Sequence, residues 1–225
     1  MSDRLLVLFP FLALIIGVVL EGVLAGILTR RGKGWLAFFS GLTSLAGVIA
    51  AWRAIVAGRV VNVSFGLWDG PVQLAYHIDG LSVLFALMGA GIGTAVLLYA
   101  VTYMDGEKGT TRFFSLILIF IAGLINLVYT ADLFVFYLNW EVVGLCSFLL
   151  VGFWYNQPEA AYGARKVFTI THLAGYGLQR FQSDAVGHAS IGVSDRLVAH
   201  QLLACLWHPT CRIGSRFRVV HSIAV

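Results

Sequence analysis

Residues 132–154 form an apolar run of helix length that holds one carboxylate, Glu141, near its middle. At about 1.5 Å per residue the run spans ~34 Å, enough to cross a hydrocarbon core of ~30 Å. Glu141 then lies near the midplane, where an ionised side chain costs at least ~2.5 kcal/mol. Within the helix only the hydroxyl of Tyr137 could assist it. We expect Glu141 to transfer protons with a partner from another helix or water, or to be a protonated, hydrogen-bonded structural residue.

Three further carboxylates are candidates for proton transfer: Glu21, Asp79 and Asp132. Glu21 sits about two-thirds along the apolar run 5–28, where helix packing or solvation at the membrane interface competes with a proton role. Asp79 lies beside His77 at the water boundary of a later run. Capping of a helix explains Asp79, and a role in proton uptake is the alternative. Asp132 begins the run that contains Glu141.

The composition excludes a soluble globular domain. Hydrophobic residues make up 59% of the 225 residues and charged residues only 12%, against about 25% charged residues in soluble domains. We therefore expect an all-α polytopic membrane protein that binds no nucleic acid. The net charge of +4 then matters through its placement along the chain.

We expect neither a metal nor a cofactor in this chain. Cys205, His208 and Cys211 are spaced in a way that invites a zinc interpretation, but no paired C-x-x-C motif accompanies them. The sequence also contains no phosphate-binding glycine loop and no hydrolytic triad.

Apolar runs predict about six membrane-spanning helices joined by polar links. The runs cover residues 5–28, 35–57, 79–104, 113–129, 132–154 and 167–178. The last would be only ~18 Å long as a helix, too short to span the core unless preceding residues enter it too. Between the second and third runs, apolar and polar residues alternate on both sides of Asp69-Gly70, which predicts a β-hairpin outside the membrane.

Two pairs of glycines stand four residues apart within the apolar runs. They are Gly22 with Gly26 and Gly89 with Gly93. Small residues at this spacing let the backbones of neighbouring membrane helices approach closely. Both pairs therefore predict helix contacts.

Basic residues beside the runs are unevenly distributed between the two sides. One side holds Arg30, Arg31, Lys33, Lys108, Arg112, Arg165 and Lys166, and the other holds Arg4, Arg53 and Arg59. Loops rich in Lys and Arg stay in the cytoplasm. We expect a multi-pass protein of the cell inner (plasma) membrane, with the N-terminus and the hairpin outside.

The composition changes after residue 178. Residues 1–178 form the expected transmembrane bundle, whereas residues 179–225 contain five Arg, two Asp and four of the six His. We expect a basic extramembrane tail that is disordered or results from a frame change in the coding sequence, with a natural extension as the alternative. Residues 194–208 could form one amphipathic helix.

Several motifs resemble one family. HIDGLSVLF, LLYAVTYM, RFFSLILIF and FYLNWEVVGLCSFLLVGFWY followed by GARKVF are similar to the antiporter-like proton-pumping subunits. These comprise the large membrane subunit of respiratory complex I, of the subunit 5 or L type, and the related large subunit of Mrp sodium/proton antiporters. The resemblance covers roughly residues 1–178. It implies an incomplete antiporter-like helical bundle, since the family has fourteen to sixteen helices with inverted repeats.

The resemblance also implies roles for particular residues. The glutamate of the family's WE motif, Glu141 here, forms a mid-membrane charge pair with a lysine on a seventh helix that has no counterpart in this chain. The complex I type reads N-R-I-G-D in its sixth helix, where residues 171–175 read THLAG. His172 therefore replaces the Arg and Gly175 the Asp, which favours a divergent or Mrp-like branch.

The resulting functional expectation is a proton-translocating membrane subunit, or its N-terminal fragment, of an NADH:quinone oxidoreductase-type complex. Glu141 would carry the proton, with Glu21, His172, Asp79 and Asp132 as further candidates. The expected partners are other membrane subunits, the lipid bilayer and protons, while NADH and quinone are reached only through partner subunits. No redox centre is expected in this chain, which leaves open whether it is part of an enzyme. An Mrp-type antiporter subunit and an inactive membrane scaffold are the alternatives.

Overall fold

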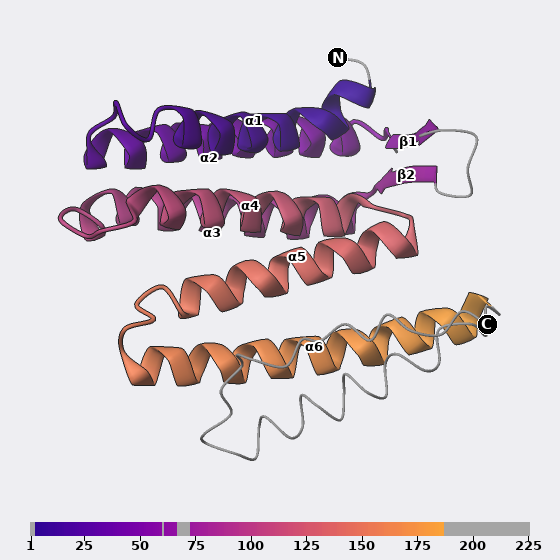
Figure 1. Ribbon diagram of the computed structural model, residues 1–225. Coiled ribbons are helices and arrows are strands. Elements are labelled where there is room, and N and C mark those ends of the chain that lie inside the picture. The colour runs from indigo at the N-terminus through magenta and orange to yellow at the C-terminus, as the bar shows by residue number, and fades with distance from the viewer. Residues whose placement is uncertain (1–2, 60, 67–72, 187–225) are drawn as a thin grey trace, which may run out of the picture.

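The computed structural model describes residues 3–59, 61–66 and 73–186, which form six helices and one β-hairpin (Figure 1). The helices are α1 (Asp3–Val23), α2 (Arg30–Val56), α3 (Gly80–Tyr103), α4 (Thr110–Tyr129), α5 (Leu133–Val151) and α6 (Pro158–Val186). The strands are β1 (Val61–Gly66) and β2 (Gln73–Ile78). The helices run roughly parallel or antiparallel to one another, with α1 and α2 at one side of the bundle and α6 at the other. The all-α fold class with a single hairpin is confirmed for the described residues.

Of the six described helices, five, α1 to α5, are long and apolar enough to cross a membrane. The sixth run is also helical, but α6 is longer than its apolar part. It begins at Pro158 and continues to Val186, past the composition change at residue 178. Charged side chains, including Arg165 and Lys166, make the first half of this continuous helix less apolar. Backbone hydrogen bonds within a helix need no apolar side chains, so the helix can outlast the apolar run.

Polar caps set the beginnings of three helices. The carboxylate of Asp79 accepts hydrogen bonds from the backbone N–H (2.8 Å) and the hydroxyl (2.7 Å) of Ser82 at the start of α3. These hydrogen bonds lower the pKa of Asp79 below its usual value. Asp132 accepts two backbone N–H groups of α5, each at 2.9 Å, and Thr29 accepts one at the start of α2. The capping interpretation of Asp79 is confirmed.

The hairpin pairs β1 and β2 in an antiparallel register with Val61 opposite Ile78 and Val63 opposite Tyr76. These four side chains share one face and are buried, as the period-2 pattern requires. The strand β2 also contacts the α4–α5 link, where the N–H of Ala131 donates to the carbonyl of Ala75 at 2.8 Å. The predicted hairpin is confirmed, while its expected turn at residues 69–70 lies outside the described residues.

Glycines permit close helix contacts at one of the two predicted pairs. A Cβ atom added to Gly93 would lie 2.6 Å from Ile121 of α4, and one added to Gly89 would collide with Leu124 of the same helix. Within the part of the chain that the structure describes, the predicted contact at Gly22 and Gly26 is not found, because an added Cβ would meet nothing within 4 Å at either position. α1 ends at Val23, so Gly26 lies in the following turn.

Close approach on α1 occurs at Gly17 instead. An added Cβ there would lie 2.5 Å from the Oγ of Ser40 on α2 and 3.3 Å from Leu118 of α4. Gly17 therefore lies where α1, α2 and α4 meet.

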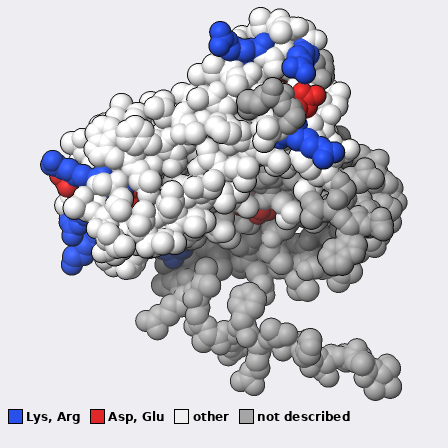
Figure 2. Space-filling model, turned by 90° about the horizontal axis from the view of Figure 1, so that it is seen from above, with Lys and Arg blue, Asp and Glu red and all other residues white. Residues whose placement is uncertain are grey.

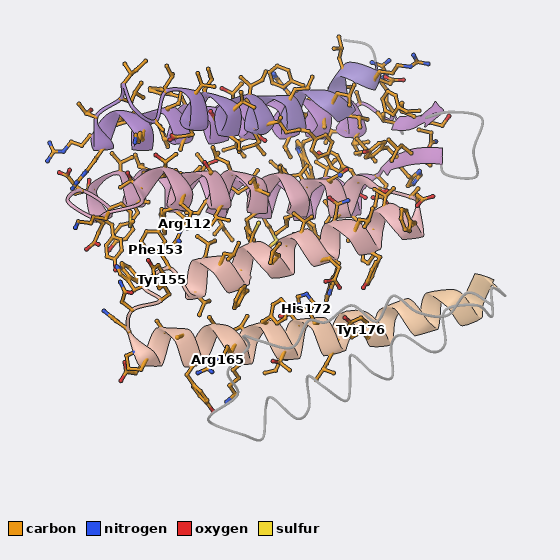
Figure 3. All side chains as sticks on the ribbon, viewed as in Figure 1. Arg112, Phe153, Tyr155, Arg165, His172 and Tyr176 are labelled. Atoms are coloured by element: carbon orange, nitrogen blue, oxygen red, sulfur yellow. The ribbon has the colours of Figure 1, made fainter. Side chains whose placement is uncertain are left out.

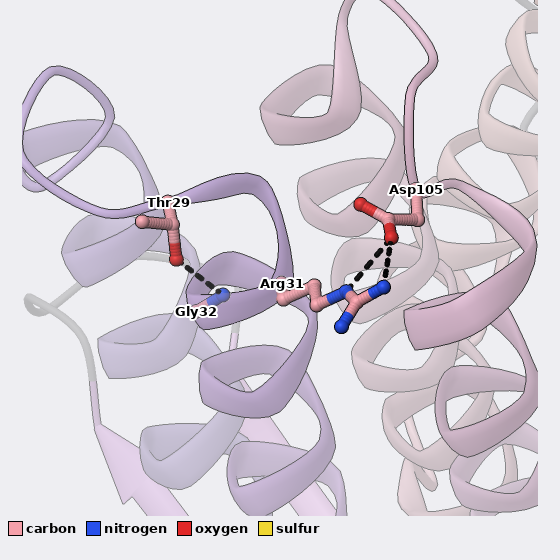
Figure 4. A network of polar contacts seen from close by, with 4 residues as sticks. All are labelled: Thr29, Arg31, Gly32 and Asp105. Atoms are coloured by element: carbon pink, nitrogen blue, oxygen red, sulfur yellow. Dashed lines mark hydrogen bonds and ion pairs between the residues drawn. The ribbon is translucent and has the colours of Figure 1, made fainter.

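The charges gather at the two ends of the bundle, and the surface between them is largely uncharged (Figure 2). At the end holding the α1–α2 and α3–α4 connections, Arg31 forms an ion pair with Asp105 at 2.6 Å, next to the Thr29 cap (Figure 4). At the other end, Arg59 lies 3.6 Å from Asp3. An apolar band bounded by charged ends is what a bilayer requires.

Candidate proton-transfer site

The site lies where α5 and α6 cross. Small residues let the two helices approach, since a Cβ added to Gly144 of α5 would lie 2.8 Å from the Cγ2 of Thr171 on α6. One turn before Gly144, α5 carries Glu141, the ninth of its nineteen residues. The crossing therefore brings the middle of α5 against the middle of α6.

The link between the two helices is anchored to α4. The guanidinium of Arg112 donates to the carbonyl of Phe153 at 3.0 Å. It also lies over the rings of Phe153, at 5.0 Å, and Tyr155, at 5.7 Å, and Figure 3 shows the three side chains together at this connection. These contacts help to hold the beginning of α6 in place relative to α5.

The side chains of Glu141 and His172 meet across the crossing. The Nε2 atom of His172 lies 3.0 Å from the Oε2 atom of Glu141. Figure 3 shows His172 on the part of α6 that runs alongside α5. The side chain of His172 is 15% exposed and that of Glu141 is 25% exposed, so the pair is mostly enclosed. The structure thus brings together two of the five candidate residues.

The second nitrogen of His172 determines the protonation of the pair. Its Nδ1 atom lies 3.0 Å from the carbonyl oxygen of Phe168. A carbonyl only accepts, so Nδ1 must carry a hydrogen. The Nε2 nitrogen then either donates its own proton to a Glu141 carboxylate or accepts one from a protonated Glu141. In both forms a single proton is shared between the two residues.

Gly175 leaves the space that the Glu141 carboxylate occupies. A Cβ atom added to Gly175 would lie 2.7 Å from the Oε1 of Glu141 and 3.5 Å from the indole nitrogen of Trp140. A side chain at this position would displace the carboxylate from His172. The glycine that replaces the family's Asp is therefore part of the geometry of the pair.

The remaining candidates lie elsewhere. Asp79 and Asp132 cap α3 and α5, and their carboxylates are engaged by the amides described above. Glu21 is buried on α1, next to α2 and α4, and Lys33 is the cation that interacts with it. The structure does not bring these three carboxylates into contact with Glu141.

Sequence reasoning missed one buried polar pair. The side-chain amide of Asn126 on α4 donates to the Oδ1 of Asn139 on α5 at 3.0 Å, and Asn139 also donates to the carbonyl of Val135. Asn139 is 9% exposed. The sequence did contain a signal for this pair. Each of the two apolar runs carries an amide, and the very short link between the runs makes α4 and α5 antiparallel neighbours.

Within residues 3–59, 61–66 and 73–186 no three His, Cys, Asp or Glu side chains gather to hold a metal ion. Cys205, His208 and Cys211, and the expected amphipathic helix 194–208, lie outside the described residues.

Two family models match the chain. The one described as NADH-Ubiquinone oxidoreductase (complex I), chain 5 N-terminus, matches residues 69–114. The one described as NADH:quinone oxidoreductase/Mrp antiporter, TM, matches residues 130–179. The second match contains both Glu141 and His172, and it ends within α6, close to the end of the resemblance at residue 178.

Curated relatives agree with these matches. The NAD(P)H-quinone oxidoreductase subunit 5, chloroplastic, of Lemna minor is 34% identical over 159 residues, which cover 67% of this chain and 21% of the relative. The protein of the same name from Physcomitrium patens is 30% identical over 177 residues, which cover 76% of this chain and 24% of the relative. The matched region thus spans between a fifth and a quarter of the length of these relatives.

Proposed function

Because this chain belongs to the antiporter-like membrane subunits of complex I and matches their N-terminal part, we propose that it translocates protons within an NADH:quinone oxidoreductase-type complex. The observation that carries the proposal is the Glu141–His172 pair at 3.0 Å in the middle of α5. Other membrane subunits are its partners, and NADH and quinone are handled by those partners. The names of the relatives favour this complex over a sodium/proton antiporter.

The pair can pass one proton at a time. A proton added to the Glu141 carboxylate leaves a neutral acid beside the His172 imidazolium. The neutral acid does not repel the imidazolium. However, the imidazolium has lost its counter-charge, and burial disfavours an unpaired charge. The imidazolium then releases its Nε2 proton to water, which is the acceptor that this proposal requires. Transfer of the Glu141 proton to the freed Nε2 restores the pair, so that one proton enters and one leaves.

The geometry of the pair can be tested by a substitution at Gly175, which leaves both Glu141 and His172 in the chain. Gly175→Ala is expected to push the Glu141 carboxylate away from His172 and to lower proton translocation severalfold, because the new methyl group takes the position next to Oε1. The end of a flexible side chain can move at little cost, so assembly should persist. The measurement is proton uptake by vesicles that contain the assembled complex during NADH oxidation.

The matched control is Gly177→Ala, two residues along the same helix, where an added Cβ meets nothing within 4 Å. It carries the same change in helix propensity and should translocate protons as wild type does. Equal activity of the two variants would contradict the proposed role of the pair. Complexes that pump equally well with and without this polypeptide would instead support the scaffold alternative.

The proposal places the N-terminus and the hairpin outside the cell membrane, following the uneven distribution of basic residues. A Cys at His77, exposed on β2, should react with a membrane-impermeant maleimide from outside intact cells. A Cys at Asn156, exposed in the α5–α6 link, should react only after the membrane is opened. Cys205 and Cys211 are replaced by Ser in both variants, while Cys146 is buried. Labelling of Asn156→Cys in intact cells would invert the topology.

A further inference from the structure

A second buried carboxylate, Glu21, has no role in the site described above. It lies in the last turn of α1 and is 0% exposed. Both of its carboxylate oxygens are buried and make no hydrogen bond with any residue that the structure describes. An ionised carboxylate without hydrogen bonds is very costly to bury, and such a group becomes neutral instead. The environment of Glu21 therefore favours the protonated acid.

Glu21 faces the place where three helices meet. One turn earlier on α1, Gly17 touches Ser40 of α2 and Leu118 of α4. Because α1 runs antiparallel to both helices, Glu21 lies against the beginnings of α2 and α4. By helical periodicity α4 presents the apolar Phe114 there, one turn before Leu118. Phe114 is buried at 1% exposure.

One cation acts on Glu21 from α2. Lys33, in the first turns of that helix, interacts electrostatically with the Glu21 carboxylate. Its ammonium group is held by the hydroxyl of Thr111 on α4, to which it donates at 2.9 Å. The half-buried ammonium therefore has one protein hydrogen bond and can donate two more. An ionised Glu21 would attract it.

The other cationic side chains near this end of the bundle either bind other residues or are exposed to solvent. Arg31 is paired with Asp105, and Arg112 donates to Phe153. Arg30 and Lys108 are exposed. No residue within one turn of Glu21 on α1 is titratable. Among the residues that the structure describes, Lys33 is thus the charged group that can compensate a charge on Glu21.

From this arrangement we propose that Glu21, Lys33 and Thr111 form a second proton-binding site, which exchanges protons with the water at the end of the bundle that holds the α1–α2 connection. The protonated acid is the resting form, with Lys33 bound to Thr111. Loss of the proton creates a carboxylate that is stabilised by Lys33. The site is built by α1, α2 and α4 and is independent of the Glu141–His172 pair on α5 and α6.

Infrared difference spectroscopy of the purified full chain in lipid nanodiscs tests this inference. At neutral pH a protonated-carboxyl band should be present that shifts in D2O, because the site exchanges with water. Glu21→Gln, which is nearly isosteric, should remove the band, whereas Glu141→Gln should leave it in place. The second comparison separates this site from the proposed function.

Two further variants test the role of the cation. In Lys33→Met the band should persist to higher pH, by about 1 to 3 pH units, because the charge that favours the carboxylate is gone. Lys108→Met, which removes an exposed cation at the same end, should leave the titration unchanged. The inference is overturned if no band at neutral pH depends on Glu21, if the band does not shift in D2O, or if Lys33→Met titrates as wild type does.

Discussion

Glu141→Gln is expected to reduce proton translocation about 100-fold, the lower range of what a positioned proton-transfer group contributes, while membrane insertion and assembly stay near wild type. Gln has the shape of Glu, and its carbonyl can accept the Nε2 proton of His172, which lies 3.0 Å from the native carboxylate. It cannot take up and release a proton. The measurement is proton uptake by vesicles containing the assembled complex, normalised to the amount of this chain present.

Glu159→Gln is the matched control. Glu159 is an exposed carboxylate in the first turn of α6, so its replacement changes the charge by the same amount without touching the crossing. Wild-type translocation is expected. If the pair acts as one unit, Glu141→Gln combined with His172→Gln should be no worse than Glu141→Gln alone, since effects within a unit are not additive. Wild-type pumping by Glu141→Gln would exclude the proposed relay.

The sequence predicted the helices well because their ends and apolar lengths are local properties. Asp79 begins α3 as a cap, and the alternation around residues 61–78 is a hairpin in the structure. The helix α2 begins at Arg30, five residues before the predicted start at residue 35. The prediction began with the apolar residues and therefore left out the basic first turn that follows the Thr29 cap. The length of α6 was also underestimated, since an apolar run measures what a bilayer tolerates and not where helical hydrogen bonds stop.

The candidate site was only half accessible to sequence reasoning. Glu141 stood out because a carboxylate in an apolar run is costly wherever its neighbours are. His172 became a candidate only through the family motif, and its contact with Glu141 depends on how α5 and α6 cross. That crossing depends on the Gly144–Thr171 contact and on the Arg112 contacts with the α5–α6 link, which join segments distant in the sequence. The complete burial of Glu21 likewise follows from three helices meeting.

Contacts at closely spaced glycines also depend on how the helices pack, which the local sequence does not reveal. Gly22 and Gly26 have the spacing of close-packed membrane helices, yet they lie at and beyond the end of α1, where none of the described helices covers them. Gly89 and Gly93 have the same spacing and pack tightly against α4. The spacing alone cannot tell which side of a helix meets a neighbour.

Gly93→Val is expected to destabilise the bundle more than any other single change considered above. A Cβ atom at residue 93 would lie 2.6 Å from both Cγ1 and Cδ1 of Ile121 on α4, and valine adds two further methyl groups at that point. Ile121 is 2% exposed and belongs to the core, so it has little space into which to move. Overpacking of this kind costs about 1–3 kcal/mol, which should lower the thermal unfolding midpoint of the full chain in detergent.

Gly91→Val separates this contact from the intrinsic effect of the substitution. Gly91 lies in the same helix, and an added Cβ there meets nothing within 4 Å. Both variants replace glycine by the same β-branched residue, so the change in helix propensity is shared. Only Gly93→Val forces α3 away from α4. The difference between the two unfolding midpoints therefore measures the α3–α4 contact, and equal midpoints would show that this close approach does not exist in the membrane-extracted protein.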